Sequence, residues 1–205
     1  MPYGKHWEWR GFGQTEATFR SWFKTLPFLY PPSSTPLRDD YLWTPACVHN
    51  VKLRHDALKF KRFLERRGAF ERWLEDESEL LPFPLDAAHL HELEALLDVR
   101  LPEIPQQPVD RATLLALIAR AEPPVRVVTV IKRRRLARWT PAGLNANVVL
   151  EWTRIAQPLA TETVAIEHDD LGIVQAAHAR LASHLAGLEA MNYLQAIGRW
   201  VGKRG

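Results

Sequence analysis

The sequence predicts an α+β protein organised around a sheet that closes into a barrel with a charged interior. About seven stretches alternate apolar and polar residues with the period of two that is typical of strands, and about five others have helical spacing. On several predicted strands the polar face is charged, and the charges are mostly basic. Closing such a sheet would gather these side chains in one cationic interior.

Composition limits the class of protein. The chain has 205 residues, of which 46% are hydrophobic and 25% charged, and its net charge is only +3. Cys47 is the single cysteine, which excludes an intramolecular disulfide and a cysteine-based metal cluster. No apolar run approaches the roughly 20 residues that span a bilayer. The first residues also lack the apolar stretch of a signal peptide, so we expect a cytoplasmic protein with no membrane partner.

The first third of the chain contains four predicted strands, at residues 5–12, 40–43, 51–54 and 58–63. Trp7 and Trp9 share one face of the first strand, and its other face carries His6, Glu8 and Arg10. The last two strands are joined by a short turn and form a hairpin. Four cations alternate with the apolar residues of that hairpin: Lys52, Arg54, Lys59 and Lys61.

Helices are predicted before, between and after the strands. A short one is expected at 15–24, ahead of a Pro/Ser-rich loop at 31–36. The middle of the chain is predicted to be helical, because Phe70, Trp73 and Leu74 have helical spacing and because aspartates cap the segments 86–97 and 110–121. The acidic run 75–77 is interpreted as solvent-exposed. Two last helices follow, from Asp169 or Asp170 to about 188 and from about 191 to 201.

Three further strands are predicted at 125–139, 147–155 and 161–168. The first contains a basic run of ambiguous phase: Arg133 and Arg135 share a face with Thr129, and Lys132 and Arg134 share the other with Val130. The face with Thr129 is the more polar, so we favour Arg133 and Arg135 as interior residues. The other two strands each carry a carboxylate, namely Glu151 and Glu167.

Converging cations with a few carboxylates suit a polyphosphate. Arginine makes bidentate contacts to phosphate oxygens, and lysine supplies a point charge. Carboxylates can hold the Mg²⁺ or Mn²⁺ that accompanies the phosphates. The alternative for any one strand is an ordinary solvated face over a one-sided core. Six charged strands in one chain favour the shared interior.

The order of these segments resembles the CYTH, or triphosphate tunnel metalloenzyme, superfamily over about residues 5 to 200. That resemblance implies an eight-stranded antiparallel β-barrel, or tunnel, with helices packed outside, as a single domain over 1–205 with a helical insertion at about 64–122. It also implies Mg²⁺ or Mn²⁺ held by glutamates and a triphosphate held by basic tunnel residues.

The resemblance can be followed along the sequence. The family opens with Glu-x-Glu-x-Lys, where this chain has His6, Glu8 and Arg10. Its later Glu-x-Glu resembles Ala165-x-Glu167, so a carboxylate is missing at each of these two places. Its Arg-x-Arg and lysine strands resemble the basic hairpin, its Lys-x-Arg strand lies within 132–135, and its intervening acidic residue resembles Glu151. Asn192 and Tyr193 are similar to its closing Ser-Tyr region.

The resemblance implies a hydrolase acting on the acid anhydride of a nucleotide, thiamine triphosphate or inorganic triphosphate. Glu8 and Glu167 would be catalytic, and Glu8, Glu151 and Glu167 would bind the metal. The following would bind phosphates: Arg10, Lys52, Arg54, Lys59, Lys61, Arg133 and Arg135. Two alternatives stay open: a non-catalytic module that binds a polyphosphate or nucleotide, and an RNA-binding β-domain with its basic residues outside. A nucleic-acid partner is not favoured, and a Trp-rich surface could support a homodimer.

Overall fold

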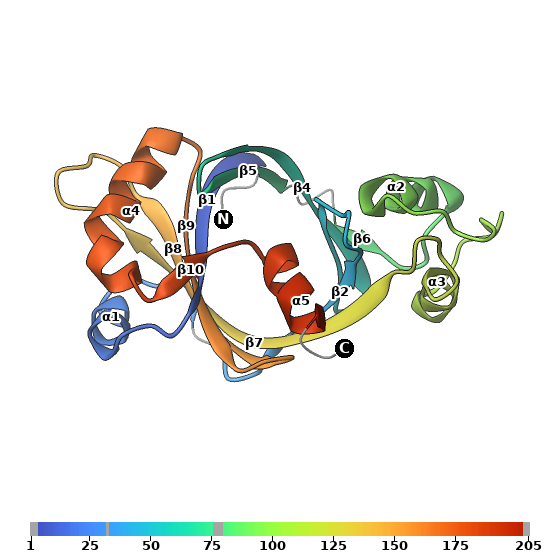
Figure 1. Ribbon diagram of the computed structural model, residues 1–205, viewed down its shortest axis with the longest axis horizontal. Helices are drawn as coiled ribbons and strands as arrows, with labels where there is room; N and C mark the ends of the chain where they lie inside the picture. The colour runs from blue at the N-terminus through green and yellow to red at the C-terminus, as the bar shows by residue number, and fades with distance from the viewer. Residues whose placement is uncertain (1–3, 32, 76–79, 203–205) are drawn as a thin grey trace.

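Eight strands form a closed antiparallel barrel in the computed structural model, which describes residues 4–31, 33–75 and 80–202 (Figure 1). Around the ring their order is β1, β5, β4, β3, β2, β7, β8 and β9, and β9 pairs again with β1. Their bounds are β1 (Gly4–Gly13), β2 (Leu37–Trp43), β3 (Asn50–Arg54), β4 (Ala57–Arg67), β5 (Phe70–Glu75), β7 (Arg126–Trp139), β8 (Val148–Gln157) and β9 (Thr161–His168). Two short strands pair with β4 and β1 respectively: β6 (Leu80–Pro82) and β10 (Leu188–Ala190).

The first strand closes the barrel because it pairs along both edges. Glu8 lies opposite Glu71 of β5 on one side and opposite Glu167 of β9 on the other. An eight-stranded barrel has an interior just wide enough for side chains to fill or for one small ligand. The α+β class and the antiparallel barrel expected from the sequence are therefore confirmed.

Helices lie around this barrel in two groups and at one end (Figure 1). Their bounds within the described residues are α1 (Ala17–Phe23), α2 (Ala87–Leu97), α3 (Arg111–Ile118), α4 (Leu171–Leu185) and α5 (Tyr193–Gly202). The predicted aspartate caps are present: Asp86, Asp110 and Asp170 each accept a hydrogen bond from a backbone N–H of the first turn. In the described part of the chain no helix combines the length and apolarity that a membrane crossing requires.

Where helices pack against the barrel, the outward faces of the strands are apolar. Trp7 and Trp9 pack with the apolar face of α4, in the group that also contains α1. On the other side, Val51, Leu53 and Phe60 of the hairpin pack with α2 and α3. Each fully buried side chain of this size contributes roughly 1.5–3 kcal/mol. This packing fixes the strand phase and turns the charged faces of the strands inward.

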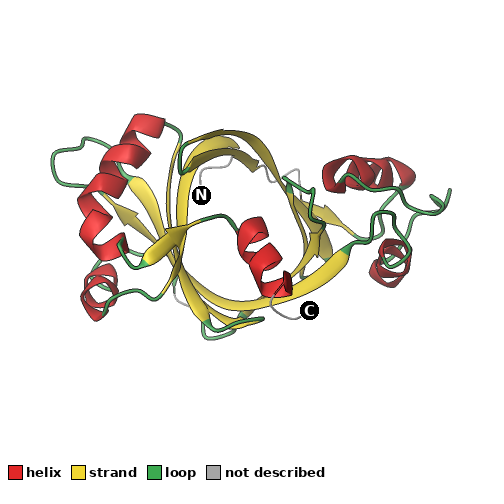
Figure 2. Ribbon diagram, viewed as in Figure 1, coloured by secondary structure: helices red, strands yellow, loops and turns green. Residues whose placement is uncertain are grey.

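Helix α5 lies across the ring of strands (Figure 2). Its residues Tyr193, Ile197 and Trp200 are buried with Phe12 and Tyr41. The rings of Tyr41 and Tyr193 stack, with their centroids 5.4 Å apart. Part of the barrel interior is therefore apolar and filled by the helix, and the remainder is the charged region described below.

The helix predicted around residues 70–74 is wrong, because this segment is strand β5. Gly68 has φ of +61°, which favours glycine, and it lies in the two-residue turn after β4. The turn reverses the chain so that Arg67 lies opposite Phe70. The segment 64–122, expected to be a helical insertion, thus begins with barrel strands and contains helices only over α2 and α3 among its described residues.

Candidate functional site

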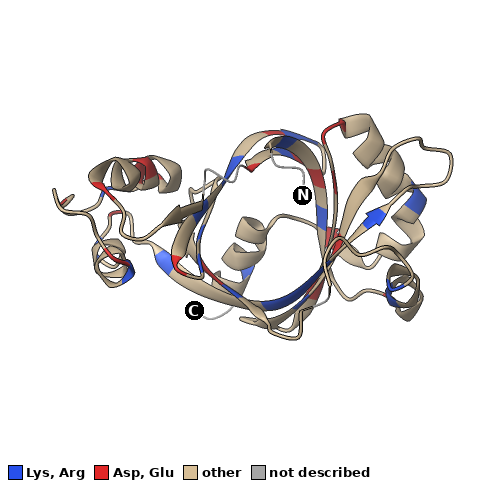
Figure 3. Ribbon diagram, turned by 180° about the vertical axis from the view of Figure 1, so that it is seen from behind, with Lys and Arg blue, Asp and Glu red and all other residues tan. Residues whose placement is uncertain are grey.

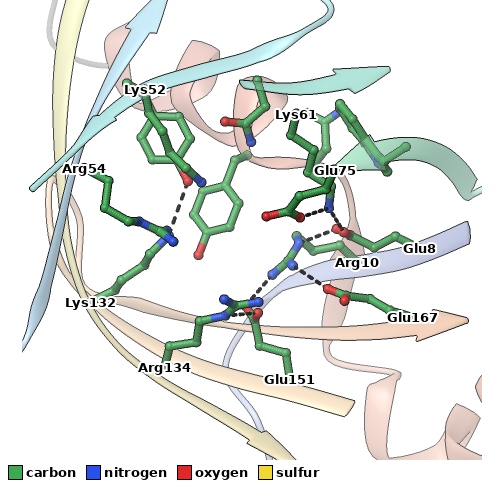
Figure 4. Close-up of a pocket in the computed structure, with 15 residues that line it drawn as sticks. Glu8, Arg10, Lys52, Arg54, Lys61, Glu75, Lys132, Arg134, Glu151 and Glu167 are labelled. Atoms are coloured by element: carbon green, nitrogen blue, oxygen red, sulfur yellow. Dashed lines mark hydrogen bonds and ion pairs between the residues drawn. The ribbon is translucent and has the colours of Figure 1, made fainter. Parts of the chain in front are cut away.

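The interior of the barrel contains a dense set of ionisable side chains. Basic and acidic positions follow the strands around the ring (Figure 3). Ten of these side chains, from β1, β3, β4, β5, β7, β8 and β9, line one cavity (Figure 4). They are Glu8, Arg10, Lys52, Arg54, Lys61, Glu75, Lys132, Arg134, Glu151 and Glu167. The free cavity is only about 40 Å³ because ion pairs fill most of the interior.

One group of charges surrounds the guanidinium of Arg10. Its Nε lies 2.6 Å from Glu8, its Nη1 lies 2.9 Å from Glu151, and its Nη2 lies 3.7 Å from Glu167. All four side chains are buried. Strand register explains the meeting, because Glu8 lies opposite Glu167, and both Arg10 and Glu151 lie opposite Ala165. All three residues predicted to bind metal therefore converge, but on an arginine.

The other oxygens of two of these glutamates are also paired. Lys61 Nζ lies 2.5 Å from Oε2 of Glu8, and Arg134 Nε donates to Oε2 of Glu151. Although burial opposes ionisation, Arg10 and Lys61 lower the pKa of Glu8 to about 2, and Arg10 and Arg134 hold the pKa of Glu151 well below its usual range. Both glutamates are ionised at neutral pH.

Glu167 differs from its two neighbours. Its pKa is raised to about 7, chiefly by burial. Lys61 acts in the opposite direction, and the charges of Glu8 and Glu151 add to the effect of burial. Its contact with Arg10 is the loosest of the three, at 3.7 Å. Glu167 is therefore the carboxylate of this group that can exchange a proton near neutral pH.

A second group surrounds Asp39, a fully buried residue of β2. Arg54 binds both of its oxygens, at 2.7 and 2.8 Å, and the ammonium groups of Lys132 and Lys52 lie 2.8 and 3.7 Å away. These cations hold the pKa of Asp39 well below its usual range. Burial lowers the pKa of Lys132 to about 8 despite Asp39, and it also lowers the pKa of Lys52 well below its usual range.

Glu75 joins the lysines of β4. Its Oε1 lies 2.5 Å from Lys59, and its Oε2 lies 3.8 Å from Lys61. Burial opposes ionisation of Glu75, but Lys61 and Lys59 lower its pKa. The expectation that the acidic run 75–77 is solvent-exposed is wrong for Glu75, and residues 76 and 77 lie outside the described part of the chain.

The predicted basic residues are mostly inside. Five of the seven proposed to bind phosphates line the cavity or lie beside it, namely Arg10, Lys52, Arg54, Lys59 and Lys61. The preference for Arg133 and Arg135 is wrong, because Lys132 and Arg134 point into the barrel. Arg133 is exposed, and Arg135 lies over Trp152 among the outward-facing residues.

The physical reason for this error lies in the apolar part of the interior. Val130 shares the inward face with Lys132 and packs with α5. The apolar Val130 therefore lies inside the barrel, although its apolar character favoured an outward position for its face of the strand. Thr129, which favoured the other phase, instead donates to Asp40 in an ion-pair group with Arg38 and Arg111.

Sequence reasoning did not place four charged residues in the interior. Asp39 was not considered, Glu75 was interpreted as solvent-exposed, and Lys132 and Arg134 were on the face of their strand that was not favoured. The signal for Glu75 was the Gly68 turn, which marks a hairpin whose second strand places Glu71, Trp73 and Glu75 on one face. The signal for Asp39 was its alternation with Tyr41, because both residues face the same way from β2.

The two departures from the family pattern lie near the Arg10 group. His6 is buried, its Nε2 has no hydrogen-bond partner among the described residues, and burial lowers its pKa to about 4. A neutral imidazole is therefore expected there at physiological pH. Ala165 is also buried and leaves no oxygen between Arg10 and Glu151.

The residues present do not fit a divalent ion in this arrangement. Mg²⁺ prefers six oxygen ligands at about 2.0–2.1 Å in octahedral geometry. Both oxygens of Glu8 and both of Glu151 already contact cationic side chains. Among the described residues no group of three or more His, Cys, Asp or Glu is arranged to hold a metal ion.

Comparison with known proteins gives similarity of shape at low sequence identity. No family model matches the chain, and no curated protein matches it. A conserved hypothetical protein from Pyrococcus furiosus is 15% identical, with a TM-score of 0.48, over 93% of this chain and 98% of its own. A Bacillus halodurans protein described as a putative adenylate cyclase is 12% identical, with a TM-score of 0.48, over 94% and 98% of the two chains. Similarity at this level supports no assignment of family, activity or ligand.

Proposed function

We propose that the barrel interior binds a polyphosphate-containing anion, either inorganic triphosphate or the triphosphate group of a nucleotide or of thiamine. The observation that carries the proposal is the charge of the interior. Six basic and four acidic side chains line the cavity, and Lys59 and Asp39 lie beside it, so seven cations accompany five carboxylates. A buried excess of positive charge favours a multiply charged anion.

The arrangement of the cations favours phosphates over a simple anion. Arg54 and Lys132 come from different strands and meet at Asp39, so a chain of phosphates could bridge several such donors. Arginine binds phosphate oxygens in pairs, and lysine adds a point charge. The free cavity is small, so the ligand would replace carboxylates as the partner of these cations.

Hydrolysis is a second candidate, and Glu167 is the observation that favours it. Its pKa of about 7 suits a general base that accepts a proton from water at neutral pH. Both oxygens of Glu8 accept from cations, which makes it the less suitable of the two predicted catalytic glutamates. The alternative of an RNA-binding domain with external basic residues has no support from the inward position of Lys52 and Lys61.

The proposal is tested by isothermal titration with tripolyphosphate, ATP and thiamine triphosphate, using orthophosphate as a weak competitor. Lys132→Gln removes an interior cation, and Arg133→Gln removes its exposed neighbour on the same strand as a matched control. Loss of a charge-assisted hydrogen bond of about 1.5–3 kcal/mol should weaken binding roughly 10- to 100-fold in Lys132→Gln alone. Equal effects of the two substitutions, or no binding by the wild type, would exclude the interior as the site.

Phosphate release from the same three compounds tests the second candidate. The assay is run with EDTA, Mg²⁺ and Mn²⁺, on the wild type and on Glu167→Ala. Release by the wild type that disappears in Glu167→Ala supports hydrolysis. Tight binding of a triphosphate compound without phosphate release under all three conditions would exclude hydrolysis and support a protein that only binds the anion.

A further inference from the structure

The guanidinium of Arg10 occupies the centre of a three-carboxylate arrangement. Each of its three nitrogens lies toward a different glutamate: Nε toward Glu8, Nη1 toward Glu151 and Nη2 toward Glu167. The three carboxylates come from three neighbouring strands, β1, β8 and β9. Figure 4 shows Arg10 between these side chains. A positive group at this position neutralises charge that would otherwise be buried unpaired.

The arginine is held firmly in this position. It is 7% exposed, and Thr163 Oγ1 lies 3.5 Å from its Nη1. The plane of Tyr193 limits movement on another side, with the centroid of its ring 5.1 Å from Cζ. The pKa of Arg10 is raised well above its usual range by Glu151 and Glu8, although burial acts in the opposite direction. It carries its charge at every physiological pH.

We propose that Arg10 takes the place of a divalent cation between Glu8, Glu151 and Glu167, so that the wild-type protein has a built-in monovalent cation where a metal ion would otherwise bind. It follows that the interior binds its anion without Mg²⁺ or Mn²⁺; this consequence alone rests on the proposed function. It also follows that shortening Arg10 uncovers a divalent-metal site formed by the three glutamates.

The geometry explains why removing Arg10, and not another interior arginine, would create a metal site. Lys61 and Arg134 reach Glu8 and Glu151 from outside this centre, at the oxygens that Arg10 does not bind. Removing Arg10 therefore takes the cation away from Oε1 of Glu8, Oε1 of Glu151 and the carboxylate of Glu167 at the same place. Oε1 of Glu151 keeps only the neutral hydroxyl of Thr153, at 3.0 Å, among its described partners. Carboxylate oxygens are the ligands that Mn²⁺ and Mg²⁺ prefer. Arg54 provides the matched control, because it is also an interior arginine but has a single carboxylate partner among the described residues, Asp39.

The experiment measures Mn²⁺ binding by electron paramagnetic resonance and equilibrium dialysis, with no phosphate present. The wild type and Arg54→Ala should bind no stoichiometric Mn²⁺. Arg10→Ala should bind one equivalent, and the further change Glu167→Ala should abolish that binding. Stoichiometric Mn²⁺ on the wild type would overturn the inference, as would a folded Arg10→Ala that binds none.

Arg10→Ala leaves three buried carboxylates without their shared partner, so it could fail to fold in EDTA. It is then refolded with Mn²⁺, and its circular dichroism and thermal midpoint are compared with those in EDTA. Recovery in Mn²⁺ supports the inference, because the ion would restore the missing charge, and failure to recover overturns it.

Two measurements keep this inference separate from the proposed function. Tripolyphosphate titrated into the wild type in EDTA tests the function, and Mn²⁺ titrated alone tests the role of Arg10. Absence of tripolyphosphate binding would contradict the proposed function and would not affect the inference about Arg10. Tripolyphosphate binding that requires Mn²⁺, with the metal bound to the wild type, would contradict the inference about Arg10 and support the proposed function.

Discussion

The two sides of the barrel interior have opposite charge balances. On the β1–β8–β9 side, three glutamates share Arg10, with Lys61 and Arg134 at the margin. On the β2–β3–β7 side, Asp39 alone has three cationic neighbours, Arg54, Lys132 and Lys52. The first side is balanced within itself, and the second has a surplus of positive charge.

If the interior binds an anion as proposed, this difference would allow it to be stable and still accept that anion. Buried charges are tolerated when each has a partner, and an unpaired one is costly. Burial lowers the pKa of Lys132 to about 8, and the neighbouring charge of Arg54 lowers it too, although Asp39 acts in the opposite direction. An incoming anion would supply the missing partner there, whereas on the other side it would meet carboxylates.

The largest expected effect is on stability and compares the two arginines. Arg10→Ala should lower the free energy of unfolding at pH 7 by about 3–5 kcal/mol, because it removes the cation that three buried carboxylates share, and Glu167 has no other ion pair among the described residues. Arg54→Ala should cost less, about 1–3 kcal/mol, because Asp39 keeps Lys132 and Lys52. Urea unfolding with unchanged slope measures both values. Equal losses would mean that the two sides do not differ in the way described.

The next effect concerns affinity and compares two interior lysines. Lys132→Gln should weaken tripolyphosphate binding by about 10- to 100-fold, since it removes a cation from the side with surplus charge. Lys61→Gln should weaken it less, because Lys61 is already bound to Glu8 at 2.5 Å and lies near Glu75. Calorimetric titration gives both dissociation constants. A larger loss in Lys61→Gln would place the anion on the carboxylate side.

A third effect concerns pH and Glu167. Its pKa of about 7 lies above the usual value of 4.5, so the folded state binds more protons than the unfolded state between these values. Its contribution to stability is therefore complete below about pH 4.5 and is lost as the pH rises through 7. The quantity to compare is the free energy of unfolding of Glu167→Gln minus that of the wild type. This difference should be higher at pH 8 than at pH 5 by on the order of 1–3 kcal/mol. Parallel pH profiles would show that Glu167 does not titrate in this range.

The smallest effect is proton uptake by Lys132. At pH 8, near its pKa, about half of the Lys132 side chains are protonated, and a bound polyanion should raise that pKa. Binding should then take up roughly half a proton per site. Titration in buffers of different ionisation enthalpy measures this number, and Lys132→Arg should reduce it. Net proton release at pH 8 would contradict the assignment.

Much of the fold could be predicted from local patterns, because helices cover one face of many strand segments and the alternation survives there in the sequence. Trp7 and Trp9 against Glu8 and Arg10 are an example, since burial against α4 fixes their phase. The error at β5 came from three apolar residues that satisfy helical spacing while lying in a strand. There the glycine turn and the pairing with β4 determine the structure.

The candidate site was predictable only where the interior is uniformly charged. The hairpin cations met this condition, and Lys52 and Lys61 lie inside. The prediction of the inward face was wrong for β7, because the interior beside this strand changes from the apolar contacts of α5 to the ion pairs. The partner of each charge was also beyond local reasoning, because Arg10 meets Glu151 across 141 positions of the chain.

The double pairing of β1 has a consequence for how the protein folds. This strand leaves the ribosome before both of its neighbours in the ring, and contacts such as Arg10 with Thr163 join residues 153 positions apart. Such distant contacts slow folding because the loop entropy is lost before the contacts form. During synthesis, β1 therefore stays without one of its two neighbours in the ring until β9 emerges. Until then, the charged residues of β1 remain hydrated.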